Sequence, residues 1–189
     1  SNLAGVYNAE QNYAASEPLL KRALAIQEKR LGPDHPEIGT TLNNLGFVYH
    51  SQERYPDAEK AYRRALTIDE KAFGADNPRL TTVLNNLAQV LEISKKLTDA
   101  EIFYKRSLAI REKNPDSEGN DLLLSLSGLA RIYRSQGKLD LAATNYRRVV
   151  ELQEKRVGKE SPELATPLNN LGMIYFEQEK YADAEKLYK

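Results

Sequence analysis

The chain has 189 residues, and its 27 lysines and arginines balance 27 aspartates and glutamates. This neutral charge gives no field that would concentrate nucleic acid or anionic lipid, so we expect neither a nucleic acid nor a membrane surface as a partner. Cysteine is absent, which excludes disulfides, thiolate metal sites and cysteine nucleophiles. No stretch approaches the roughly 20 apolar residues of a membrane span, and the start lacks a signal peptide, so we expect a cytoplasmic protein.

A four-residue motif, Leu-x-x-Leu, returns every 42 residues. Its copies begin at Leu42, Leu84, Leu126 and Leu168, and Ser1-Asn2-Leu3 falls in the same register. A fixed period of this size indicates a solenoid, in which units that cannot bury their apolar faces alone stack on their neighbours. We expect one array over residues 1–189, with units at 1–35 (first helix truncated), 36–77, 78–119, 120–161 and 162–189 (second helix truncated).

Each unit has the apolar pattern of two helices. In the second unit, Leu42, Leu45 and Tyr49 stand at i, i+3 and i+7, which places them on one face of a helix. Ala58 and Tyr62, one turn apart, mark the second helix of the same unit. Small residues would let the two backbones approach closely. They are Gly46, Ala88, Ala130 and Gly172 in the first helices, and Ala58, Ala100, Ala142 and Ala184 in the second.

Short linkers separate the helical pairs. Gly32, Gly74 and Gly158 suit left-handed C-terminal caps. An N-cap followed by proline at the first helical position is expected at His35-Pro36, Asn77-Pro78 and Ser161-Pro162. One linker differs, since Pro115 should end its helix about a turn early. The alternatives there are a ligand-sensitive hinge and a simple loop variant.

The unit resembles the tetratricopeptide repeat, whose pattern is W-x2-L-G-x2-Y, then A-x3-F, then P. Leu42 stands in the place of the tryptophan, Leu45-Gly46 and Tyr49 match, and Ala58 with Tyr62 matches A-x3-F. The second helix is longer than in the standard 34-residue unit. The 42-residue period is similar to that of kinesin light chain repeats. This resemblance implies an all-α, right-handed superhelical solenoid of antiparallel helical hairpins.

The resemblance also implies that a second stripe on each first helix lines a concave groove. Asparagines recur on that stripe, and similar domains use such amides to hydrogen-bond the backbone of a bound peptide. We expect this role for Asn44, Asn86 and Asn170. Two interpretations stay open for Asn43, Asn85 and Asn169, which either face the groove or bond to an asparagine in the next repeat.

Side chains beside the asparagines vary from unit to unit, as ligand-selecting residues do. They are Phe47 and His50, then Gln89, then Arg131 and Arg134, then Met173 and Phe176. A basic centre flanked by aromatic and soft apolar groups suits an acidic peptide with an aromatic anchor, and kinesin light chains are similar in taking such cargo peptides. The alternatives are an ion pair between repeats for Arg131 or Arg134, and partial packing in the core for Phe47 and Phe176.

No catalytic triad order, phosphate loop or metal-spaced cluster is present, so we expect neither an enzyme nor a bound cofactor. The predicted function is a scaffold that binds a protein or peptide ligand in its groove. One alternative is a structural spacer that self-associates end to end through its truncated terminal repeats. Another is a regulatory region of a larger signalling protein, since the only methionine, Met173, lies far from the start.

Overall fold

The computed structural model describes residues 2–114 and 121–188, and within those ranges every regular element is a helix. The elements are α1 (Asn2–Ala9), α2 (Tyr13–Leu31), α3 (Pro36–Ser51), α4 (Tyr55–Phe73), α5 (Leu80–Ile93), α6 (Leu97–Lys113), α7 (Asp121–Ser135), α8 (Leu139–Val157), the 3-10 turn η1 (Pro162–Leu164), α9 (Ala165–Glu177) and α10 (Tyr181–Tyr188). The all-α prediction is confirmed. The chain forms two compact units, residues 1–117 (unit 1) and 118–189 (unit 2).

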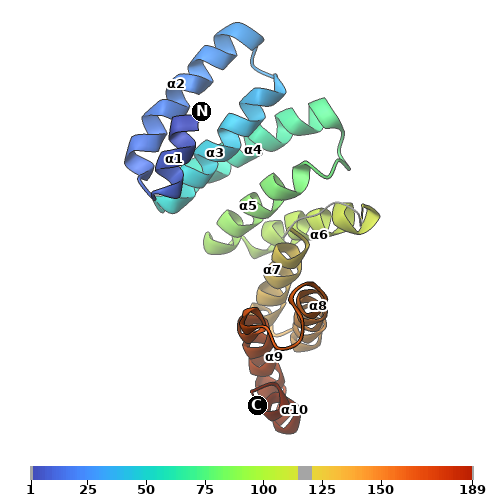
Figure 1. The fold of residues 1–189 in the computed structure, drawn as a ribbon. Coiled ribbons are helices and arrows are strands. Elements are labelled where there is room, and N and C mark those ends of the chain that lie inside the picture. The colour runs from blue at the N-terminus through green and yellow to red at the C-terminus, as the bar shows by residue number, and fades with distance from the viewer. Residues whose placement is uncertain (1, 115–120, 189) are drawn as a thin grey trace. The chain divides into compact units, whose positions relative to one another are not determined.

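Helices pack in sequential pairs inside each unit. In unit 1 the hairpins α1–α2, α3–α4 and α5–α6 are joined by contacts of α2 with α3 and of α4 with α5. In unit 2, α7 packs on α8 and α9 on α10, and α8 joins the two pairs through α9. Figure 1 shows successive helices of each hairpin running antiparallel. The first helix of each hairpin is called the A helix below, and the second is called the B helix.

Small residues set the closeness of the hairpins, as predicted. A Cβ atom on Gly46 would lie 2.5 Å from the ring of Tyr62, which is fully buried on the paired helix. Gly172 stands in the same relation to Tyr188, with a Cβ distance of 2.7 Å. A larger side chain at Gly46 would collide with the buried Tyr62 ring, whereas the ring that faces Gly172 belongs to Tyr188, which is 52% exposed and can shift.

Three glycines end long B helices, although not in the predicted conformation. Gly32, Gly74 and Gly158 have φ of 83°, 87° and 85°, so the positive φ is confirmed. Their ψ values of 162°, 157° and 159° lie far from the left-handed helical region. This combination is open almost only to glycine. It turns the chain out of the helix into an extended linker instead of closing a left-handed cap.

The predicted N-caps differ in outcome. His35 caps α3 as expected, because its Nδ1 accepts the Glu37 N–H at 3.3 Å and Pro36 begins the helix. Asn77 also accepts a backbone N–H, from Arg79 at 2.9 Å, but α5 begins only at Leu80. The expectation that Pro78 opens α5 is therefore wrong, since the intervening residues form a turn with i to i+3 bonds.

The third cap, Ser161, accepts the Glu163 N–H at 3.3 Å. Its helix opens as the 3-10 turn η1 before α9 starts at Ala165. The predicted early end at Pro115 concerns a residue outside the described ranges. The preceding helix, α6, ends at Lys113.

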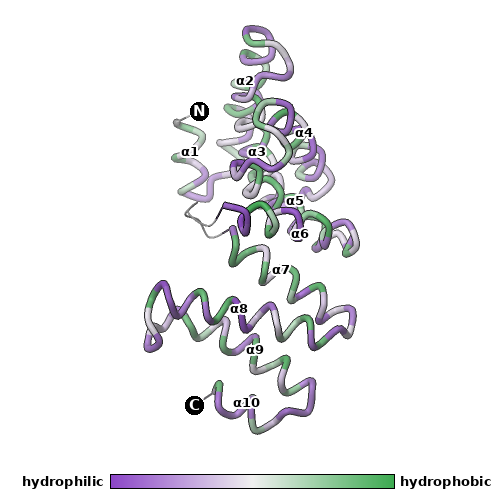
Figure 2. Tube along the Cα trace, turned by 90° about the vertical axis from the view of Figure 1, so that its right-hand side faces the viewer, coloured by the Kyte–Doolittle hydropathy of each residue, from purple (hydrophilic) through white to green (hydrophobic). Residues whose placement is uncertain are grey.

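Hydropathy follows the packing. Along the tube in Figure 2, apolar and polar turns alternate on the A and B helices. In α5 the apolar side is fully buried at Leu84, Leu87 and Leu91. Because each A helix buries this side against its neighbours, its opposite side is left to form a functional surface.

Candidate functional site

The accessible side of unit 1 is carried by its A helices α3 and α5. On α3 the exposed or half-exposed residues follow one another at helical spacing, while Leu42, Leu45 and Gly46 between them are buried. The same register continues on α5. We define the exposed stripe as Thr40, Asn44, Phe47, Thr82, Asn86 and Gln89.

The asparagines of unit 1 have three different environments. Asn86 is half-buried and donates its amide N–H to Oδ1 of Asn43 at 3.2 Å, which links α5 to α3. Asn85 is only 1% exposed, so a ligand on the stripe has no surface of Asn85 to contact. Asn44 is half-buried and makes no side-chain hydrogen bond with the residues that the structure describes.

These environments revise the predicted site. For Asn43 the bond between repeats is the interpretation that the structure supports, and Asn85 is removed from the site because its side chain is packed inside. Asn86 combines a place on the stripe with a bond to Asn43. Asn44 alone of the four keeps its whole amide available.

Aromatic rings flank Asn44 on α3. Phe47 is 41% exposed, and the edge of its ring meets Tyr13, at the start of α2, with centroids 6.0 Å apart. His50 lies 6.0 Å from the Tyr55 ring at the turn between α3 and α4. Burial lowers the pKa of His50 below its ordinary value, so its imidazole is neutral near pH 7. These groups form a neutral, partly apolar end of the stripe.

Unit 2 carries the remaining predicted residues. On α9, Asn169 is exposed, with its amide 3.7 Å from the Met173 sulfur, while Asn170 is half-buried. Phe176 is 60% exposed and its ring packs edge-on against Tyr181, with centroids 5.3 Å apart. Phe176 is therefore a surface residue, and the alternative that it packs in the core is wrong.

Both predicted arginines of unit 2 lie on α7. Arg131 is exposed. Arg134 donates from Nε to the Glu177 carboxylate at 2.9 Å, an ion pair that ties α7 to α9. The alternative of an ion pair between repeats therefore holds for Arg134, and its charge is already matched inside unit 2.

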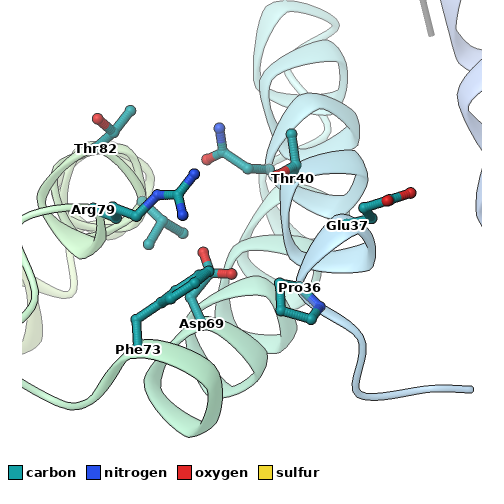
Figure 3. Close-up of a pocket in the computed structure, with 9 residues that line it drawn as sticks. Pro36, Glu37, Thr40, Asp69, Phe73, Arg79 and Thr82 are labelled. Atoms are coloured by element: carbon teal, nitrogen blue, oxygen red, sulfur yellow. The ribbon is translucent and has the colours of Figure 1, made fainter. Parts of the chain in front are cut away.

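A pocket of about 250 Å³ lies beside the stripe, between α3 and α5, with α4 beneath it. Figure 3 shows the Asp69 carboxylate rising from α4 toward the Arg79 guanidinium, with Thr40 and Thr82 on either side. Burial raises the pKa of the Asp69 carboxyl above its ordinary value, and the charge of Arg79 opposes that shift. The Arg79 guanidinium lies 4.6 Å from the centre of the Phe73 ring.

The comparison with known families decides what these hairpins are. The family profile described as tetratricopeptide repeat matches residues 1–71, 37–113 and 121–189. The chain belongs to the tetratricopeptide repeat family. The family predicted from Leu45-Gly46, Tyr49 and Ala58 is thus confirmed, and a tetratricopeptide repeat fold supports a role as a protein–protein interaction scaffold.

Solved structures show the same fold. A protein from Podosopora anserina with nearly identical TPR-like repeats of the kinesin light chain kind is 24% identical, with a TM-score of 0.84 over 99% of this chain and 88% of the other. BtubC (BKLC) from P. vanneervenii is 22% identical, with a TM-score of 0.85 over 98% of this chain and 74% of the other. The apo form of RapI is 15% identical, with a TM-score of 0.85 over 98% of this chain and 65% of the other. The predicted kinesin light chain type of repeat is confirmed. A search of curated protein sequences gave no significant match.

Asp69 and Arg79 line the pocket between α3 and α5, and neither was among the predicted site residues. A signal for Asp69 exists in the 42-residue register, where the equivalent residues change in charge while their neighbours repeat. They are Gln27, Asp69, Arg111 and Gln153. Asp69 lies on a B helix, α4, whereas all the predicted groove residues lie on A helices.

Within residues 2–114 and 121–188, no three histidine or acidic side chains cluster in a way that could hold a metal ion. Over the same ranges, none of the helices combines the length and apolar character needed to cross a membrane.

Proposed function

We propose that the chain is a protein-interaction scaffold that binds a partner segment in extended conformation along the exposed stripe of unit 1. The observation that carries this proposal is Asn44, a half-exposed amide with no partner inside the described protein. An extended peptide has N–H and C=O groups that need partners, and one asparagine amide can donate to one and accept from another. Asn44 is therefore the expected contact with the partner backbone.

The neighbouring residues complete this surface. Asn86 uses one N–H group on Asn43, which leaves its carbonyl oxygen to accept from the ligand backbone. Phe47 and Tyr13 offer an aromatic edge against which an apolar or aromatic ligand side chain can pack. Gln89, half-buried on α5, supplies a further neutral donor and acceptor. The stripe of unit 1 thus combines backbone recognition with one anchor position.

The predicted groove residues of unit 2 extend the proposal. Phe176 and Met173 provide apolar surface on α9, and Asn170 lies beside them. The proposed preference is for acidic ligands with an aromatic anchor, as for kinesin light chain cargo, and Arg134 contributes little charge to it because Glu177 already pairs with Arg134. We propose that the chain acts by binding and not by catalysis.

The test is selection of a random peptide library on the purified chain, with counter-selection on an Asn44→Leu variant whose fold is checked by circular dichroism. We expect peptides that are retained by the natural chain and lost by the variant. Asn145→Leu is the matched control, because the same change is then made on the B helix α8, away from the stripe. Peptides that bind both variants equally well would contradict the proposal.

A further inference from the structure

The pocket beside the exposed stripe contains a charge that the fold of unit 1 leaves unmatched. Asp69 is half-buried, and its carboxylate makes no hydrogen bond or ion pair with the residues that the structure describes. Arg79 is close enough to oppose the pKa shift of Asp69, yet its guanidinium is placed over the Phe73 ring. Burying a carboxylate without a partner costs free energy, so its retention calls for an explanation outside unit 1.

Two of the three equivalent positions hold a neutral side chain with an internal hydrogen bond, and the third holds a cation, Arg111. Gln27, one period before Asp69, accepts the Thr41 hydroxyl at 2.8 Å. Gln153, two periods after Asp69, donates to the Glu163 carboxylate at 3.1 Å. The open carboxylate is therefore a property of the α3–α5 position and not of the repeat.

A glycine makes room for this carboxylate. A Cβ atom on Gly39 would lie 2.3 Å from Oδ1 of Asp69, so any other residue would force Asp69 to move. The residues one and three periods later, Thr81 and Ala165, both have a Cβ. The pocket between α7 and α9, of about 160 Å³, has Gln153 in the place of Asp69 and therefore lacks this carboxylate.

The size and charge of the pocket limit its occupant. A volume of about 250 Å³ is smaller than the range usual for whole drug-sized ligands and suits one side chain. The Asp69 carboxylate faces the pocket without a hydrogen bond or ion pair to the described residues, and the Arg79 guanidinium lies over the Phe73 ring. The Glu37 carboxylate points away from the pocket in Figure 3. Thr40, Asn43 and Thr82 of the lining lie on or beside the exposed stripe, so a side chain can enter from a segment bound there.

We propose that this pocket receives one basic side chain, lysine or arginine, from the partner segment, with the Asp69 carboxylate as its counter-charge. The proposal rests on the proposed function, because it assigns a side-chain preference to the segment bound on the stripe. It makes Asp69 a specificity-determining residue, whereas Asn44 contacts the ligand backbone irrespective of sequence.

The pocket is tested first with small probes, N-acetyl-arginine methylamide and N-acetyl-lysine methylamide, in a titration followed by amide NMR shifts of the full chain. We expect saturable shifts at Thr40, Asn43 and Thr82. The neutral citrulline analogue, which keeps the shape of arginine, should bind at least about tenfold more weakly than the arginine probe. Equal binding of citrulline and arginine probes, or shifts confined to other surfaces, would overturn the proposal.

Asp69→Asn is the matching variant. It should lower probe affinity about tenfold and leave the melting temperature equal or higher, because it removes an unpaired half-buried charge. Asp34→Asn removes the same charge from an exposed position that pairs with Lys71, and it should leave probe affinity unchanged. If both variants lower the probe affinity equally, non-specific electrostatic attraction explains the binding and the proposal fails.

The same probes separate this proposal from the proposed function. Probe binding that depends on Asp69, together with no peptide selected on the stripe, would support the pocket and count against the extended partner segment. Selected peptides that depend on Asn44 but tolerate citrulline in place of every basic residue would support the stripe and overturn the pocket.

Discussion

At the residue scale, similar side chains in the repeat register take different roles because their neighbours differ. Asn85 and Asn86 are adjacent in sequence, yet one is buried and the other bonds to Asn43. Helical periodicity predicts which face each asparagine occupies. It does not predict the bond between Asn86 and Asn43, because that bond depends on the separation of α3 and α5.

The buried tyrosines give a test at this scale. The Tyr62 hydroxyl is buried and has no hydrogen-bond partner among the residues that the structure describes, whereas the Tyr104 hydroxyl donates to Glu92 at 3.0 Å. We expect Tyr62→Phe to leave the free energy of unfolding unchanged or raise it by about 1 kcal/mol, and Tyr104→Phe to lower it by about 1 kcal/mol. Urea unfolding of the two variants measures the difference. A larger loss for Tyr62→Phe would show that its hydroxyl has a partner.

His50 gives a prediction on pH. Burial lowers its pKa in the folded chain below the ordinary value of 6.5, so the unfolded chain binds the proton more readily. The neutral histidine therefore contributes stability that is fully present above pH 6.5 and is lost as the pH falls through and below it. We expect His50→Gln to reduce the loss of stability between about pH 7.5 and about pH 5.5. An identical loss in both proteins, measured by urea unfolding, would contradict this.

At the element scale, the period predicts the hairpins well and the helix starts less well. Leu45, Gly46 and Tyr62 pack as their spacing indicated, because burial on one helix face is a property of the pattern itself. The start of α5 differs because Asn77 and Pro78 bond to residues three positions later and form a turn. A sequence motif of cap and proline does not distinguish this turn from a first helical turn.

Leu87 tests the packing of α5. It is fully buried, so Leu87→Ala should lower the free energy of unfolding by about 2 to 5 kcal/mol through the cavity it leaves. Gln89→Ala on the accessible side of the same helix should change stability by less than about 1 kcal/mol. Equal thermal melts for the natural chain and Leu87→Ala would contradict the core assignment.

At the scale of the whole molecule, the fold was predictable and the candidate site only in part. The 42-residue period gave the hairpins, and the outward stripe gave Asn44, Phe47 and Gln89. The Asp69 pocket was not predictable from one repeat, because it requires Gly39, Asp69 and Arg79 from three different helices or linkers to meet. Such an open space depends on what the packing leaves unfilled.

At this scale we predict that unit 1 is stably folded when it is separated from unit 2. Residues 1–117 have their own packed hairpins, and stability in repeat arrays comes mainly from contacts within repeats and between neighbours. We expect this fragment, prepared alone, to unfold cooperatively by circular dichroism and to bind the arginine probe as the full chain does. A fragment without helical signal would show that unit 1 depends on unit 2.

The central claim is that Asn44 contacts the partner backbone on the exposed stripe. Its most direct test is the ratio of dissociation constants for a library-selected peptide, measured by calorimetry on Asn44→Leu and on the natural chain, with Asn145→Leu as control. We predict about a tenfold or greater weakening for Asn44→Leu, from the loss of one or two hydrogen bonds at the interface, and no change for Asn145→Leu. Equal dissociation constants for all three proteins would show that the partner binds elsewhere.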